Sequence, residues 1–239
     1  MSALVGIASF AAPPGSTEIL AVLLAYLLGS VPFGLVLGYL VGRVDIRTIG
    51  SGNIGATNVG RALGRPWAVV AFVGDFGKGW ISTFLLAPWL ASAPENASLL
   101  AVVCGGAAVG GHCWPVYLRF RGGKGVATGC GALVGIDPLL FVLGGAVWLV
   151  TLGLFRFVSL SSMAMGLSFP LIALWRTSRA GYGSEVVLGA AALSILVFVR
   201  HRANMARILA GTEPRVGRRP RTGDASEPRE REEEQEATR

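Results

Sequence analysis

Two polar, glycine-rich segments lie among apolar stretches and carry residue types suited to binding phosphate. The first, residues 43–61, includes Ser51, Asn53 and Arg61, and the second is the turn Gly122-Gly-Lys-Gly125. Glycines let the backbone close around an anion, helix-start amides point towards it, and arginine and lysine add positive charge. The two segments predict a site for phosphorylated small molecules. Their spacing is not that of a Walker A loop, so ATP binding is not implied.

Both segments also have a simpler interpretation. The second could be only a helix start, with Lys124 extending its charge towards the membrane surface. Thr57 or Asn58 could cap the helix that follows the first segment. Capping does not account for the whole set of hydroxyl, amide and guanidinium groups, so we retain the binding hypothesis beside it.

Two more polar groups occur later in the chain. Ser162 belongs to a serine cluster in which Ser159 is expected to be a helix cap. His201 and Asn204 are three residues apart and so share a helical face. His201 could be a general base or a substrate ligand, because an unperturbed histidine titrates near neutrality. The spacing alone favours a basic cluster that binds anionic lipid.

Ionisable residues also occur inside apolar segments. Asp75 and Lys78 lie one helical turn apart, and we expect an ion pair between them. His112 precedes Trp114-Pro115, where it could either orient the turn at 122–125 or be a satisfied interior histidine.

The composition is that of an integral membrane protein. Of the 239 residues, 52% are hydrophobic and only 15% are charged, against about 25% charged in soluble domains. The net charge of +7 could signal nucleic acid, but the apolar spans make anionic lipid headgroups the expected partner. Three cysteines and two histidines, without ligand spacing, predict neither a metal site nor a cofactor.

Hydropathy predicts an all-α, polytopic protein with seven transmembrane helices in one domain, residues 1–213. The residues 214–239 are Arg- and Glu-rich without apolar periodicity, and we expect a disordered charged tail. The predicted spans are 18–40, 66–90, 98–118, 122–137, 138–156, 159–176 and 184–201.

The distribution of basic residues predicts the orientation. Arginine and lysine concentrate in residues 43–65 and 119–124 and after residue 199, whereas 91–97 has none. These basic segments share the cytoplasmic face only if 122–156 crosses twice, folding at Asp137-Pro138, rather than once as a kinked helix. The amino terminus is then outside, the carboxyl terminus is cytoplasmic, and the polar segments meet at one membrane depth.

Several motifs resemble one family, in order from about residue 20 to 213. The family is that of the bacterial acyl-phosphate:glycerol-3-phosphate acyltransferases, PlsY. The matching segments are Gly29-Ser-Val-Pro-Phe-Gly34, Asp45-Ile-Arg47, Gly50-Ser-Gly-Asn-Ile-Gly-Ala-Thr-Asn-Val59 with Arg61, Gly111-His-Cys-Trp-Pro-Val116, Gly122-Gly-Lys-Gly-Val-Ala-Thr128, Val158-Ser-Leu-Ser-Ser162, His201-Arg-Ala-Asn204 and Gly211-Thr-Glu213.

The resemblance implies an inner-membrane enzyme of phospholipid synthesis, with seven helices and a site that faces the cytoplasm. It would move a fatty acyl group from acyl phosphate to the 1-hydroxyl of glycerol 3-phosphate, which gives lysophosphatidic acid. Glu213 would serve integrity rather than chemistry. Catalytic roles are implied for Ser51, Arg61, Lys124, Ser162 and His201, and substrate binding for Asn53, Gly122, Gly123, Gly125 and Asn204.

The proposed chemistry needs little more than two anion sites. Acyl phosphate is already activated, so positioning and charge neutralisation are the main requirements. We expect Lys124 and the amides of 122–125 to hold one phosphate, and Arg61 with Ser51 to help hold the other. Direct transfer is preferred, with the hydroxyl proton passing to His201 or to a substrate phosphate oxygen. A transporter for phosphorylated solutes is the main alternative, although the chain shows no paired repeat.

Overall fold

The structure is a computed structural model that describes residues 15–181 and 183–217. Within these residues every regular element is helical, as the hydropathy pattern predicts. The first half contains α1 (Ser16–Ser30), α2 (Phe33–Leu37), α3 (Ala56–Leu63), α4 (Arg65–Trp80), α5 (Ala87–Leu90) and α6 (Ala97–Cys113). The second half contains α7 (Val126–Ile136), α8 (Pro138–Phe155), α9 (Val158–Ala180), α10 (Ser184–Arg200) and α11 (Arg202–Leu209).

Helix breaks follow local chemistry. The α1 helix ends before Pro32, whose ring removes a backbone donor and clashes with the preceding turn. Asp137 and Pro138 separate α7 from α8: the Asp137 carboxylate accepts the Leu139 amide at 3.0 Å, and the proline opens α8. The stretch 122–156 is therefore two helices, not one long kinked helix.

The number of membrane crossings is only partly determined by the helices. Among the described residues, five helical segments are long and apolar enough to cross a membrane, and α10 with α11 makes a sixth if this pair, bent by 54°, counts as one span. The α7 helix is apolar but has 11 residues, about 16 Å at 1.5 Å per residue. That length is about half the hydrocarbon thickness. Seven crossings and the direction of the termini stay predictions.

Glycines allow the central helices to pack at backbone distance. A Cβ on Gly79 of α4 would overlap the Thr128 carbonyl of α7, and one on Gly131 of α7 would overlap the Phe76 carbonyl of α4. Small residues at such positions are typical of helix packing in membranes, where dispersion contacts replace the hydrophobic effect between helices. The close α4–α7 contact fixes the start of α7, which carries the turn 122–125.

The outer surface of the bundle is apolar. Leu154, Leu171 and Ile195 are each about 70% exposed (72%, 70% and 67%) on three different helices. Contiguous exposed apolar surface on a monomer marks a membrane or protein contact. Together with the apolar spans, it identifies the bundle as an integral membrane fold.

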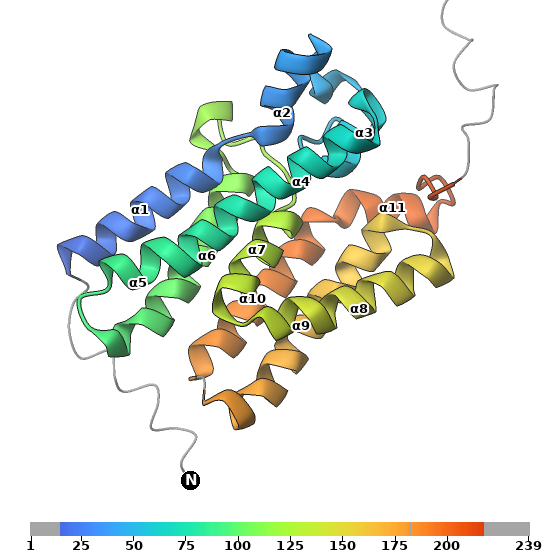
Figure 1. Cartoon of the computed structure of the whole chain (residues 1–239). Coiled ribbons are helices and arrows are strands. Elements are labelled where there is room, and N and C mark those ends of the chain that lie inside the picture. The colour runs from blue at the N-terminus through green and yellow to red at the C-terminus, as the bar shows by residue number, and fades with distance from the viewer. Residues whose placement is uncertain (1–14, 182, 218–239) are drawn as a thin grey trace, which may run out of the picture.

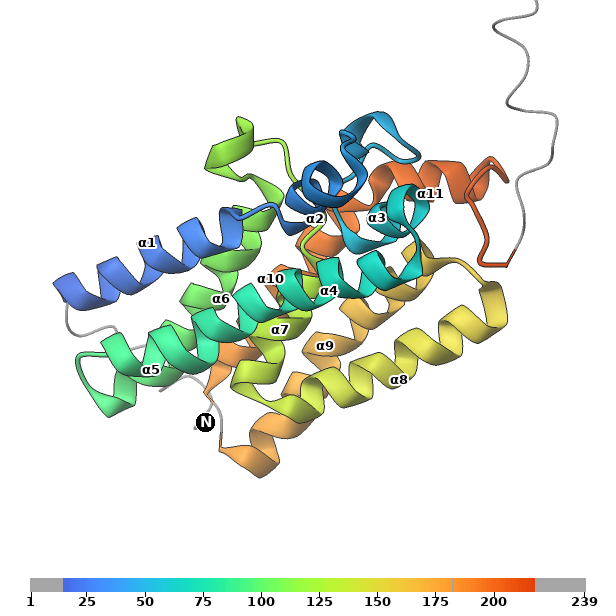
Figure 2. The ribbon, with the colours of Figure 1, turned by 45° about the horizontal axis from the view of Figure 1, so that its top comes forward.

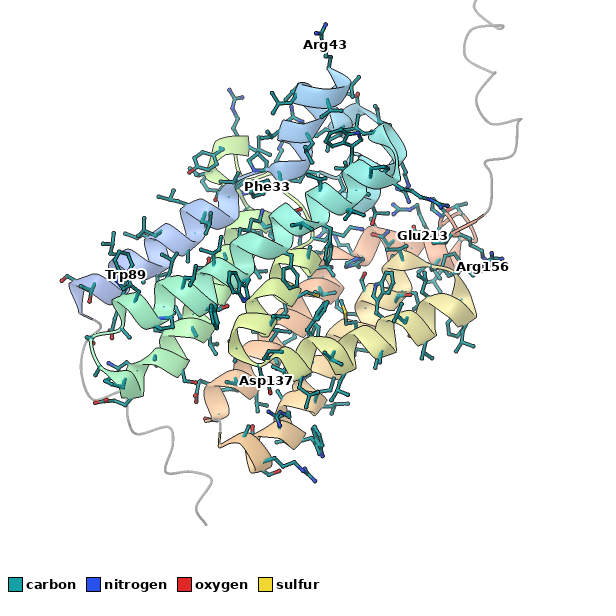
Figure 3. The ribbon with its side chains drawn as sticks, viewed as in Figure 1. Phe33, Arg43, Trp89, Asp137, Arg156 and Glu213 are labelled. Atoms are coloured by element: carbon teal, nitrogen blue, oxygen red, sulfur yellow. The ribbon has the colours of Figure 1, made fainter. Side chains whose placement is uncertain are left out.

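The polar segments gather at one end of the bundle. Figures 1 and 2 both show α2, α3 and α11 at the same end, although α11 follows α3 by more than a hundred residues. In Figure 3, Arg43, Arg156 and Glu213 lie towards this end, whereas Trp89 and Asp137 lie towards the other. The fold thus brings these polar segments to one end of the bundle, and their membrane depth stays a prediction.

Candidate active site

Lys124 is the centre of a hydrogen-bonded network that joins the turn 122–125 to α11. Its ammonium group donates to Oδ1 of Asn204 at 2.5 Å, and the Asn204 amide donates to Oε1 of Glu213 at 2.6 Å. Asn204 lies on α11, 80 residues away in the chain, and Glu213 follows the end of that helix. The network holds a cationic side chain in a defined direction, which a phosphate site requires.

Glu213 is the other end of this network. Its Oε1 also accepts from the Ser159 hydroxyl at 2.7 Å, and its Oε2 pairs with Nε of Arg207 at 2.8 Å. Burial alone raises the pKa of Glu213, but these hydrogen bonds outweigh it and hold the pKa below the ordinary value. Glu213 is therefore a charged structural link between α9 and α11, which agrees with the integrity role implied by the resemblance. Ser159 is not a helix cap, because Phe157 occupies that position of α9.

The turn 122–125 is held rigidly from both sides. Its Gly122 and Gly123 amides donate to the Cys113 and His112 carbonyls at 3.2 and 3.0 Å. The Gly123 carbonyl accepts from the Arg200 guanidinium at 2.6 and 3.0 Å, and the Gly122 carbonyl accepts at 3.1 Å. The Gly122 and Gly123 amides are thus already hydrogen-bonded and are not available to an anion. The groups left to bind one are the Lys124 ammonium and the free amides at the start of α7.

Positive charges from three other elements surround Lys124. Burial lowers the pKa of Lys124 to about 8; Glu213 opposes this shift, and the charges of Arg207, Arg61 and Arg200 add to it. An anion bound among these groups would reverse both the desolvation cost and the repulsion. Arg61, from the first polar loop, is therefore close enough for its charge to repel that of Lys124.

The first loop is organised by Asn58. Its Oδ1 accepts the Ser51 amide at 2.9 Å and the Ser51 hydroxyl at 3.2 Å, and its amide donates to the Ile46 carbonyl at 2.8 Å. Gly50 must be glycine here, because its φ is +58° and a Cβ would meet Asn58 and Arg61. The loop thus ties Ser51 to Asn58 and brings Arg61 close to Gly50, the residue before Ser51.

The expectation that Thr57 or Asn58 caps the following helix is wrong. The cap of α3 is Gly55, whose amide donates to Oδ1 of Asn53 at 2.9 Å. Asn58 lies inside α3 and is 1% exposed. The sequence indicated a further role for Asn58 only in that it belongs to a polar run longer than a helix cap requires. Asn53 therefore shapes the loop with its carbonyl oxygen, and any substrate contact would use its amide nitrogen.

His201 and Ser162 are buried near the network without joining it directly. Nδ1 of His201 lies 2.8 Å from the Val197 carbonyl, which can only accept, so Nδ1 carries the proton. The neutral ring then presents Nε2 as an acceptor. Ser162 donates to the Val158 carbonyl at 2.9 Å and accepts from the Trp148 indole at 3.4 Å, one turn after Ser159 on α9.

The expected ion pair inside α4 is confirmed. Nζ of Lys78 lies 2.8 Å from Oδ1 of Asp75, and both side chains are buried. Nδ1 of His112 lies 3.3 Å from the same oxygen. Among residues 15–181 and 183–217, no group of three His, Cys, Asp or Glu side chains is placed to hold a metal ion.

An apolar cavity opens below the polar end, between α6, α7 and α10. Its volume is about 290 Å³, and its lining is almost entirely aliphatic or glycine. Val109 at its upper end would contact a Cβ on Gly125, the residue after Lys124. Ile136 and Val186 line its lower end. The cavity therefore begins near Gly125 and extends along α7 and α10 away from the polar end.

Arg200 and Arg207 were not singled out as site residues from the sequence. Both belong to the basic run at the end of the last span, whose simplest interpretation was lipid binding. In the structure Arg200 binds the turn carbonyls and Arg207 binds Glu213. Only the position of this run on the same face as the turn hinted at these contacts.

Comparisons with known proteins give a consistent result. A family model described as glycerol-3-phosphate acyltransferase matches residues 19–211. The glycerol-3-phosphate acyltransferase of Dinoroseobacter shibae is 44% identical over 200 residues, which is 83% of this chain and 93% of that protein. The one from Geobacillus kaustophilus is 45% identical over 197 residues, 82% of this chain and 95% of that protein.

Two solved structures share the fold. Both are crystal structures of PlsY, an integral membrane glycerol 3-phosphate acyltransferase, one in the glycerol 3-phosphate form and one in the lysophosphatidic acid form. The TM-scores are 0.76 and 0.74 at 38% sequence identity. Each alignment covers 84% of this chain and 96% of the other.

Proposed function

The chain belongs to the glycerol-3-phosphate acyltransferase family, and on that premise we propose that it transfers a fatty acyl group from acyl phosphate to the 1-hydroxyl of glycerol 3-phosphate. The products are 1-acyl-glycerol 3-phosphate, which is lysophosphatidic acid, and inorganic phosphate. The observation that carries the proposal is the aimed and partly buried Lys124, bonded to Asn204 and surrounded by the charges of Arg61, Arg200 and Arg207. Such a site suits substrates that each bear a phosphate.

Each loop is assigned one phosphate. Lys124 and the amides at the start of α7 bind one, with Gly122, Gly123 and Gly125 shaping the turn and Asn204 fixing the lysine. Arg61 and the Ser51 hydroxyl help bind the other, in the loop shaped by Asn53. Arginine presents a planar fork that matches phosphate oxygens, which supports this role for Arg61.

The apolar cavity accommodates the acyl chain. Along α10 the lining extends from Val186 to Leu196, about 15 Å at 1.5 Å per residue. That is half the hydrocarbon thickness of a bilayer. A chain in this position would bring its carbonyl to the turn 122–125 and leave its tail in an apolar environment.

The transfer is direct. The 1-hydroxyl oxygen of glycerol 3-phosphate attacks the acyl carbon, the bond from that carbon to the phosphate oxygen breaks, and phosphate leaves. Lys124 and Arg61 neutralise the charge that gathers on the phosphate and carbonyl oxygens. The hydroxyl proton goes either to Nε2 of His201 or to a substrate phosphate oxygen. Ser162 serves as a polar group beside the reacting atoms.

The protein lies in the inner membrane of a bacterium, which the chain crosses seven times, and its active site faces the cytoplasm. The concentration of basic residues at the end of the bundle that carries the site supports this orientation. The catalytic domain comprises residues 1–213. Residues 214–239, predicted to be a disordered tail, lie mainly outside the described part of the chain. The Val216 amide donates to the Arg156 carbonyl at 2.8 Å, so the domain contacts the first of these residues.

An assay with purified protein in lipid nanodiscs tests the proposal. Palmitoyl phosphate with glycerol 3-phosphate should give lysophosphatidic acid by mass spectrometry and equimolar phosphate, whereas palmitoyl-CoA and palmitoyl carrier protein should not. Absence of both products would refute the proposed enzymatic activity and would favour the alternative, a transporter for phosphorylated solutes. The variant His201→Ala separates the two proton acceptors: near-full turnover at saturating substrate would exclude the histidine.

A further inference from the structure

Three buried ionisable residues outside the proposed machinery form a chain towards the turn 122–125. Lys78 donates to the Val31 carbonyl at 3.0 Å, at the break between α1 and α2, and pairs with Asp75 at 2.8 Å. The same Asp75 oxygen lies 3.3 Å from Nδ1 of His112, at the end of α6. The exposed fractions of the three side chains are 4% or less. Buried charges are costly unless they are paired, so Lys78 holds Asp75 in place, and the His112 ring packs against the paired carboxylate.

His112 contacts the turn in two ways. Its backbone carbonyl accepts the Gly123 amide at 3.0 Å. The far edge of its ring, at Nε2, occupies the place where a Cβ on residue 123 would stand. Gly123 does not have the left-handed backbone conformation that favours glycine, in contrast to Gly125 with φ of +80°. Position 123 therefore excludes a side chain because of the histidine ring, not because of its own backbone.

We propose that His112, held by Asp75 and Lys78, is a positioning residue for the acyltransfer reaction, and that its ring is the reason why residue 123 must be glycine. The Nε2 edge of the ring stands where a Cβ of residue 123 would be, while the Arg200 guanidinium donates to the carbonyl of the same residue. The adjacent Lys124 is thereby aimed at Asn204 and the substrate phosphate. This inference rests on the proposed function, since Lys124 must bind substrate for the positioning to matter.

The contact can be tested by mutual rescue. Gly123→Ala places a methyl group against the ring and should lower kcat/KM for glycerol 3-phosphate by about 100-fold, as expected for a displacement of about 1 Å at a reacting site. His112→Asn keeps an amide for Asp75 but removes the Nε2 edge, and should cost about tenfold or less. The double variant should recover at least about tenfold over Gly123→Ala.

Gly122→Ala is the matched control. A Cβ there would overlap the His112 carbonyl and Pro115 rather than the ring, so His112→Asn should not rescue it. Additive losses in the His112/Gly123 pair, or equal rescue of both glycine variants, would overturn the inference. If Gly123→Ala fails to fold, the same comparison is made on monodisperse yield and thermal midpoint.

Failure of the proposed function and failure of the His112 inference would give different results. A wild-type protein that makes no lysophosphatidic acid would refute the proposed function, while the steric coupling could still be measured from the thermal midpoints of the four proteins. An active wild type with no coupling between positions 112 and 123 would refute only the inference. If His112 had a purely structural role, His112→Asn would lower the thermal midpoint, and the double variant would be no more active than Gly123→Ala.

Discussion

Lys124 donates a 2.5 Å hydrogen bond to Asn204, which joins the start of α7 to α11 across 80 residues of sequence. The bond leaves two of the three ammonium donors for a ligand. Asn204 is in turn fixed by Glu213, so the lysine charge has a direction as well as a position. This relationship favours a binding site over a lipid-binding surface at the polar end of the bundle.

Substrate binding should weaken at alkaline pH. The pKa of Lys124 is about 8, so the side chain is charged below that pH and neutral above it. Phosphate monoesters are already dianionic there, with a second pKa near 6. We expect KM for the substrate held by Lys124 to rise by about tenfold per pH unit above 8.

The variant Lys124→Arg provides the control for this pH effect. Arginine remains protonated throughout the range, so its KM should be higher at pH 7 but flat to pH 10. A wild-type KM that is equally flat would contradict the assignment. Steady-state kinetics with each substrate varied in turn would also show which phosphate Lys124 binds.

Removing the Arg61 fork should weaken the binding of one substrate. Loss of a charge-assisted hydrogen bond worth about 1.5–3 kcal/mol corresponds to roughly 10- to 100-fold in KM for Arg61→Ala. Arg65, an exposed arginine at the start of α4, is the matched control, and Arg65→Ala should change KM less than about twofold. Equal effects of the two variants would indicate a general electrostatic role instead.

Arg200 should be needed to hold the turn. Arg200→Ala frees the Gly122 and Gly123 carbonyls and should lower kcat/KM by about 10- to 100-fold. Arg200→Lys should recover little, because an ammonium group cannot reproduce the fork over two carbonyls. The neighbouring exposed residue gives the control variant Arg202→Ala, and full activity of Arg200→Ala would exclude the role.

Glu213 should contribute to stability more than to chemistry. Glu213→Ala removes an acceptor for Ser159, Asn204 and Arg207, and should cost about 2–4 kcal/mol. Glu185, a half-buried carboxylate that accepts one bond from Ser98, gives the matched control Glu185→Ala, which should cost less than about 1 kcal/mol. The thermal midpoint in detergent measures both.

The same carboxylate gives a pH dependence of known sign. Its folded pKa is below the ordinary value, so its stabilisation is fully present above that value and is lost as the pH falls through the folded pKa. We expect the fall in thermal midpoint from pH 5 to pH 3 to be smaller in Glu213→Gln than in the wild type. An identical fall would show that other groups dominate.

Thiol labelling can determine the orientation. The three native cysteines are buried, so single cysteines introduced at Leu209 and at Glu95 should be the reactive ones. A membrane-impermeant maleimide should label Glu95→Cys in right-side-out vesicles and Leu209→Cys in inverted ones. The reverse pattern would contradict a cytoplasmic active site.

Much of the fold follows from the sequence because its causes are local. Apolar runs of about 20 residues, the proline after Val31 and the Asp137-Pro138 break specify where helices begin and end. The Asp75–Lys78 ion pair was equally predictable, since residues three apart share a helical face. The capping roles expected for Asn58 and Ser159 were wrong because longer-range partners, Ser51 and Glu213, compete for these side chains.

The sequence by itself determined the chemistry available to this protein: two glycine-rich polar loops, Lys124, Arg61 and His201, set between apolar helices on one face. Only the tertiary structure decided that Lys124 meets Asn204, that Arg200 closes on the turn, and that the His112 ring stands where a side chain of residue 123 would be. The physical reason is that these contacts depend on how closely helices distant in the chain approach. That approach is set by glycines whose packing partners cannot be read from local sequence.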